Sequence, residues 1–222
     1  MPSLEVNRYR KPLARVLIAA STLFAPAFAS AYQPKEGNVS ATLGWILHQT
    51  NFDATHTGAR APYQGDVALI ANGDINDVGA LEIGVYHLNK QYFRSQGFQY
   101  VGEAVETIHI TMGYRHWWTS RFSTALSFAS SHSMGYVTRI HDDFAPNQAI
   151  NTSASDTTEY SADLSLQYDV FNYDRITAAV YGLYSLSFTG KPNEKADHYG
   201  VMIGLRYFIQ EKQVVEKPRD AI

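Results

Sequence analysis

The feature that most constrains the fold is the strict alternation of apolar and polar residues from Tyr160 to Val170 (YSADLSLQYDV). Successive side chains of a β-strand point to opposite faces, so this segment has one apolar and one polar face. A tilted strand of about 9–11 residues crosses a bilayer, with aromatic residues at the two interfaces. The segment is typical of a membrane strand, although a strand of a soluble sandwich would show the same alternation.

Seven further segments alternate in the same way, separated by residues that favour turns or loops. Their connections alternate in length, as in a barrel with short periplasmic turns and longer exterior loops. A soluble barrel would have the opposite polarity, with apolar side chains inward. The sequence therefore predicts an all-β fold, an eight-stranded antiparallel up-and-down transmembrane β-barrel. The expected strands are 39–50, 65–73, 80–94, 104–116, a segment from 122 that continues to about 140, 160–170, 175–188 and 197–209.

Aromatic residues near the strand ends are predicted to form two girdles at the membrane interfaces. Residues 95–103 are expected to be a loop. The girdle near the short turns would contain Trp117, Trp118, Phe122, Phe171, Tyr173 and Tyr207, and the far girdle Phe52, Tyr92, Phe93, Tyr160, Phe188 and Tyr199.

The N-terminus has the features of a secretory signal peptide: a basic region, an apolar region from Val16 to Phe28, and small residues before a cleavage site after Ala29 or Ala31. The alternative is a retained anchor helix, against which Pro26 argues. We predict a signal peptide over 1–31, the barrel over 38–209 and a periplasmic polar tail over 210–222. The 222-residue chain has net charge −3, and cleavage would remove four basic residues and only Glu5 among the acidic ones. The acidic mature chain argues against a nucleic-acid partner.

The eight alternating segments resemble the small eight-stranded outer-membrane barrel families, including the transmembrane domain of the OmpA-like group. The end of the last segment also resembles the assembly signal of such proteins, through Gly204, Tyr207 and Ile209. Two features depart from that signal: Met202 replaces a polar residue, and a tail follows Phe208. The resemblance implies a location in the outer membrane, contact with outer-membrane lipid and with the barrel-assembly machinery, and a monomer.

An eight-stranded barrel is just wide enough for its side chains to fill it. The polar faces carry charges of both signs, and charges buried in a lumen must be paired. We expect a structural network of charged side chains, with Glu82, Arg115, Asp169 and Arg206 close together near the periplasmic strand ends. A narrow ion path is the alternative. The predicted network is Glu82, Lys90, His109, Arg115, Asp163, Asp169, His198 and Arg206, with the inward Gln167 beside it.

Catalytic, metal and cofactor sites are not indicated. The chain has no cysteine, and its histidines lack zinc-type spacing. Asp142 and Asp143 match no calcium loop. Lipid A deacylase barrels use a His-x-Ser pair with a carboxylate, whereas His132-Ser133 are adjacent residues whose side chains should point to opposite faces. We therefore expect a non-enzymatic protein with a structural or surface-binding role through its exterior loops and an unknown exterior ligand. A small-solute channel and a lipid A-modifying enzyme are the alternatives.

Overall fold

The computed structural model describes residues 32–54, 58–148 and 150–209, and it is dominated by long antiparallel strands. The predicted signal peptide and polar tail lie outside these residues and remain predictions. The described part has no helix long and apolar enough to cross a membrane. The eight long strands are β1 (Val39–Thr50), β2 (Gln64–Asp74), β3 (Gly79–Gln96), β4 (Gln99–Trp117), β5 (Phe122–Ser133), β7 (Thr158–Tyr173), β8 (Ile176–Ser187) and β10 (His198–Ile209). Three short elements are β6 (Thr138–Asp142), the 3₁₀ turn η1 (Ser153–Ser155) and β9 (Glu194–Lys195).

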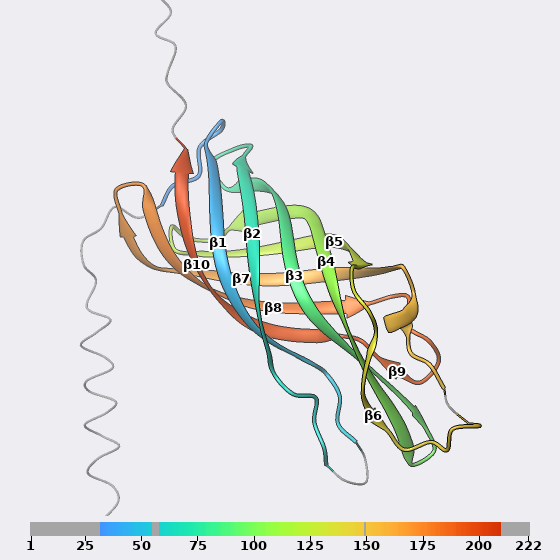
Figure 1. Ribbon diagram of the computed structural model, residues 1–222. Helices are drawn as coiled ribbons and strands as arrows, with labels where there is room; N and C mark the ends of the chain where they lie inside the picture. The colour runs from blue at the N-terminus through green and yellow to red at the C-terminus, as the bar shows by residue number, and fades with distance from the viewer. Residues whose placement is uncertain (1–31, 55–57, 149, 210–222) are drawn as a thin grey trace, which may run out of the picture. The chain divides into compact units, whose positions relative to one another are not determined.

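The long strands close into a ring (Figure 1). Each pairs with its neighbours in the chain, and β10 returns to pair with β1 over the full length of both, from Val39 opposite Ile209 to Thr50 opposite His198. Closure removes the unpaired edges that an open sheet would expose. The predicted eight-stranded antiparallel up-and-down barrel is confirmed.

Residues that alternate in the sequence of each strand point alternately to the outer surface and into the lumen. Leu166 is 45% exposed on the outer surface, whereas the next residue, Gln167, is 1% exposed in the lumen. The same arrangement around the ring leaves a belt of exposed apolar side chains. This belt includes Leu43, Val67, Leu81, Ile83, Met112, Leu126, Leu164, Val180, Val201, Ile203 and Leu205.

The two ends of the barrel differ in their connections. At one end, which we call the short-turn end, β2–β3, β4–β5 and β7–β8 are joined by short turns. At the other, the long-loop end, β3 and β4 continue beyond the ring as a hairpin, with β6 and β9 paired to their outer edges. We call these outer parts of β3 and β4, together with β6, η1 and β9, the long-loop extension (Figure 1).

This extension corrects the expected loop over residues 95–103, because β3 and β4 stay paired as far as Gln96 and Gln99. The two-residue turn between them needs a positive φ at its first position, and Gly97 has φ 64°. The expected continuation of the fifth strand is interrupted. β5 ends at Ser133, and the chain resumes beside β4 only at Thr138.

Several expected girdle residues are also corrected. Trp118, Tyr160, Phe188, Tyr199 and Tyr207 are exposed on the outer surface as predicted. Trp117 and Tyr92 instead point inward. Phe93 in the extension and Phe52 in the loop after β1 bury their rings against each other, with the ring centroids 4.3 Å apart. The sequence alone indicated the inward position of Trp117 and Tyr92, because continuing the alternation of their strands places both side chains on the inward face.

Candidate functional site

The lumen is the first candidate site, and its short-turn end contains two buried ion pairs. Arg115, 1% exposed, donates from Nε and Nη2 to both carboxylate oxygens of Glu82, at 2.5 and 3.0 Å. Its remaining donors reach the hydroxyls of Ser123 and Ser165 at 2.9 and 2.8 Å. A buried guanidinium is stable only when its charge and its donors are matched, and here both conditions are met.

Arg206 forms the second pair, at the mouth of the lumen. Its Nη2 donates to Asp169 Oδ2 at 2.5 Å, and Gln167 donates to the other oxygen of the same carboxylate. The guanidinium lies 4.6 Å from the ring of Tyr32 and 5.0 Å from that of Trp117, within cation–π range. The aromatic residue expected at the lipid interface therefore covers an arginine inside the barrel.

An apolar layer crosses the lumen next. Its members, Ile46, Ala68, Ile70, Tyr86, Leu88, Ala179, Tyr181 and Met202, are all buried. A Cβ added to Gly44 would lie 2.4 Å from the sulfur of Met202, so the glycine makes room for that side chain. These contacts fill the middle of the barrel with side chains, as expected for a ring of eight strands.

A layer of histidines and carboxylates lies beyond the apolar one. His48 contacts Asp66 at 2.7 Å, and His109 contacts Asp163 at 2.6 Å. The ring of His198 lies edge-on between the other two histidines, 5.7 Å from each ring centroid. The sequence indicated His109, Asp163 and His198 but not the pairing of His48 with Asp66, because alternation gives the face of a residue and not its neighbour on the adjacent strand.

Lys90 closes the lumen at the long-loop end. Its ammonium donates to Glu159 at 2.7 Å, and the hydroxyl of Tyr92 donates to the same carboxylate oxygen at 2.7 Å. Glu159 is absent from the predicted network because it precedes the segment that starts at Tyr160. Extending the alternation by one residue would have placed it inward.

The long-loop extension is the second candidate site, and a buried carboxylate organises it. Glu103 accepts hydrogen bonds from the backbone and hydroxyl of Thr152, at 3.0 and 2.7 Å, and from Arg139 at 2.8 Å. Burial raises the pKa of Glu103, but the hydrogen bonds from Thr152 and Arg139 outweigh burial and leave the pKa below its ordinary value. The carboxylate therefore stays charged at neutral pH and holds the loop after β6 against β4.

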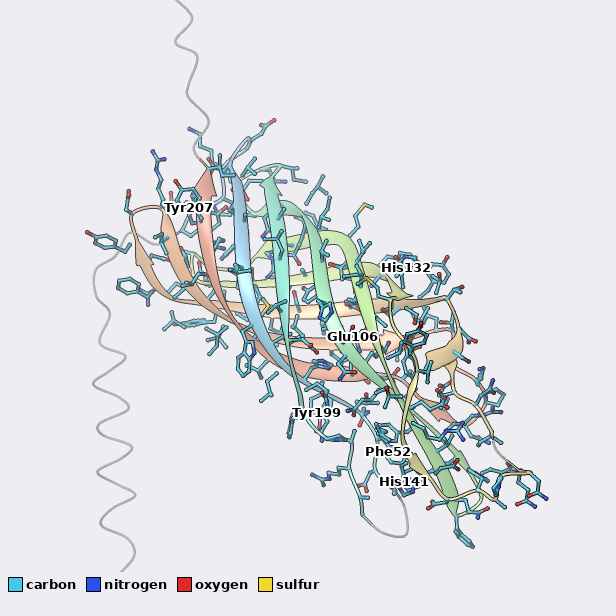
Figure 2. The ribbon with its side chains drawn as sticks, viewed as in Figure 1. Phe52, Glu106, His132, His141, Tyr199 and Tyr207 are labelled. Carbon is cyan, nitrogen blue, oxygen red and sulfur yellow. The ribbon has the colours of Figure 1, made fainter. Side chains whose placement is uncertain are left out.

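A second carboxylate fixes the neighbouring loop. Glu194 accepts from the backbone and hydroxyl of Ser153, and Lys191 donates to the carbonyl of Thr152 at 2.6 Å. On the aromatic side of the extension, Tyr100 stacks on His141 with ring centroids 4.0 Å apart. Figure 2 shows His141 of this extension, and Phe52 of the loop after β1, at the end of the molecule opposite Tyr207. The long-loop segments are thus held in a defined shape.

The geometry of His132 bears on the enzyme alternative (Figure 2). Its Nε2 lies 3.3 Å from Ser130 Oγ and its Nδ1 lies 3.2 Å from Thr158 Oγ1, so its hydroxyl partners are not Ser133. No carboxylate in the described part of the chain forms an ion pair with this ring, so the third member of a Ser-His-acid site is missing. Within the described ranges, no group of three or more His, Cys, Asp or Glu residues is placed to hold a metal ion.

The closed ring, the filled polar lumen and the apolar outer belt define the class: a small eight-stranded transmembrane β-barrel with the architecture of outer-membrane proteins. No family model matches this chain. No curated protein matches it either.

The chain is similar to solved structures of small outer-membrane barrels. One is the attachment invasion locus protein Ail of Yersinia pestis, in complex with the heparin analogue sucrose octasulfate, at 12% sequence identity and a TM-score of 0.45, over 78% of this chain and 99% of that chain. Another is the outer membrane protein OprG of Pseudomonas aeruginosa, at 12% identity and a TM-score of 0.46, over 80% of this chain and 98% of that chain.

Proposed function

We propose that the protein resides in the outer membrane, with the short-turn end in the periplasm and the long-loop extension outside the cell. The observation that supports this location is the belt of exposed apolar side chains around a ring whose charges all point inward or lie at its ends. In water such a belt would be costly, whereas in a bilayer it meets lipid tails.

Within that membrane, the proposed role is a structural or surface-binding one, carried by the exterior extension and not by transport through the lumen. The single observation that carries it is the buried Glu103 cluster, which fixes the shape of exterior loops that the barrel itself does not require. Preorganised loops on a rigid scaffold are a common basis for binding. The proposed partners are outer-membrane lipid, the barrel-assembly machinery during insertion, and an unidentified exterior ligand, with the protein itself a monomer.

Membrane location is tested by fractionation and by heat-modifiable mobility of the folded barrel on gels. Recovery of the protein as a soluble periplasmic species would contradict the proposal. The filled lumen is tested in planar bilayers at pH 7.5, where we expect no steady single-channel steps. Sizeable steps from pure protein would favour the channel, and a changed lipid A mass on expression would favour the enzyme.

The exterior extension is tested by limited proteolysis of intact cells that express Glu103→Gln. We expect faster cleavage in the loops after β6 and β8, with heat-modifiable mobility unchanged. The matched control is Glu106→Gln, since Glu106 lies on the outer face of the same strand and is exposed. Equal cleavage of the two variants would show that the buried carboxylate does not organise the loops.

A further inference from the structure

Five side chains form a continuous row across the lumen, from Asp66 through His48, His198 and His109 to Asp163. They come from β2, β1, β10, β4 and β7, so the row joins opposite walls of the barrel. Each outer histidine contacts a carboxylate, which can balance a proton on that imidazole. Among the described residues, no carboxylate forms an ion pair with the central histidine.

The surroundings of His198 offer little to balance a charge on its ring. The side chain is 5% exposed and forms a hydrogen bond with the backbone of Ala196, while within the described chain its Nδ1 has no hydrogen-bond partner. One nitrogen therefore has a partner for its proton, and the other is an unused buried acceptor. Such atoms are rare in folded proteins and call for an explanation.

The groups that face His198 from the other strands are largely cationic or able to become so. They are His48 on β1, His109 on β4 and Lys90 on β3, and Lys90 is already paired with Glu159. Asp163 on β7 and Asp66 on β2 each contact another histidine, and Tyr86 on β3 packs edge-on against His109. Next to His198 in the chain and just before β10, Asp197 accepts from the backbone of Ser187. A proton on His198 would add a charge that none of these groups balances.

A small cavity of about 20 Å³ adjoins this row, lined in part by His109, Asp163, Ser185 and His198. That volume is enough for a water molecule, and the lining offers polar groups to bind it. Water entering beside His198 would give a newly formed imidazolium its only source of solvation. Protonation would therefore favour a wetter and wider arrangement of the row.

We propose that His198 is a proton-binding site that unlocks the exterior half of the lumen in acid. At neutral pH the row is closed, consistent with the proposed non-conducting role. Toward pH 4.5 the unfavourable charge on His198 separates the histidines and admits water to the exterior half of the lumen. An unperturbed histidine gains its proton near pH 6.5, and burial of His198 beside Lys90 and two further histidines opposes that proton, so the response is expected at the acid end of the range from pH 7.5 to 4.5.

The test is hydrogen exchange of the backbone amides of the purified full-length protein in liposomes at pH 7.5 and 4.5, with the intrinsic pH dependence of exchange removed. We expect protection of the amides at the long-loop ends of β1, β8 and β10 to fall at least fivefold at the lower pH, and the melting midpoint of the heat-modifiable band to fall. In His198→Gln, which cannot take up a proton but keeps an amide donor for Ala196, both changes should be at least halved. His132→Gln removes an exposed histidine and should behave as the wild type.

An equal acid response in the wild type and His198→Gln would overturn the proposal, as would amide protection that stays constant from pH 7.5 to 4.5. If His198→Gln does not insert, ¹⁵N NMR of the histidine rings of the wild type decides the matter. A His198 ring that remains neutral at pH 4.5 would overturn the proposal. Conductance already present at pH 7.5 would instead contradict the proposed non-conducting role, so the two failures are distinguishable.

Discussion

The two ends of the molecule hold their buried charges in different ways. At the short-turn end, Arg115 and Arg206 are paired with carboxylates in the lumen. In the long-loop extension, Glu103 is held by Thr152 and by Arg139, whose side chain is 38% exposed. The first arrangement is part of the barrel itself, whereas the second fastens loops onto the barrel. The two should therefore differ in the cost of disruption and in how far its effect spreads.

The largest effect is expected from Glu82→Gln, which leaves Arg115 buried without a counter-charge. Breaking one partner of a buried pair costs about 3–5 kcal/mol. We expect a loss of that size in the free energy of unfolding from liposomes in guanidinium chloride. Glu106→Gln, an exposed glutamate on the neighbouring strand, should be nearly neutral. Equal losses in the two variants would show that the pair does not stabilise the barrel.

The next largest effect is expected on the lipid-facing surface of the strands between the two ends. An arginine is stable in the lumen when it is paired, but it is costly on the lipid face. Leu166→Arg places a charge on the lipid face near the middle of β7, where the cost is about 2–4 kcal/mol. Gln167→Ser, on the lumen face, should cost less. Unfolding from liposomes measures both.

The inside–outside assignment itself is tested by nitroxide labels at Leu166→Cys and Gln167→Cys. Oxygen, which concentrates in hydrocarbon, should relax the label at 166 more strongly than the label at 167. Equal accessibility, or strong relaxation of the label at 166 by a water-soluble agent, would contradict the assignment.

A smaller and more local effect is expected from Glu103→Gln in the extension. A hydrogen bond to a charged group contributes about 1.5–3 kcal/mol, and here the loss should be confined to the extension. Hydrogen exchange of the backbone amides after β6 should accelerate while that of β7 and β10 stays unchanged. Faster exchange throughout the barrel would show that the two ends are not independent.

The same carboxylate makes the extension sensitive to acid. The pKa of Glu103 is lower in the folded protein than its ordinary value of 4.5, so its stabilisation is complete above about pH 4.5 and is lost as the pH falls through the lower, folded value. Proteolysis of the exterior loops should accelerate below that pH in the wild type. Glu103→Gln should cleave at a rate that depends less on pH.

The smallest effect is expected at the tip of the extension, in Gly97→Ala. Gly97 has φ 64°, and a Cβ in this left-handed conformation costs about 1–2 kcal/mol. No atom of the described residues lies within 4 Å of the added carbon, so the cost is conformational alone. Exchange should accelerate at Phe98 and Gln99 only. Gly182→Ala, also with open space around its Cβ, is the matched control and should have little effect.

Much of the fold was predictable because strand geometry has a period of two, so a single register determines which residues face lipid. For Phe122, Leu126 and Tyr207, alternation in the sequence was enough to assign the outer face correctly. The same rule says nothing about depth or about contacts across the lumen. His48 and Asp66 lie on neighbouring strands whose register is set by hydrogen bonding, and no local pattern links them. The extension was missed for a related reason: beyond the membrane neither face of a strand needs to be apolar, so residues 95–103 look like a loop.

The stacking of Tyr32 on Phe208, at 4.9 Å, has a consequence for how the protein forms. Tyr32 precedes the first strand and Phe208 lies near the end of the last, so their contact requires both ends of the sheet to have met. Joining the first strand to the last closes the longest loop in the chain and is the slowest kind of pairing to nucleate. The aromatic pair over Arg206 can therefore form only after β1 and β10 have paired. It stabilises the junction between the first and last strands, where the sheet closes into a barrel.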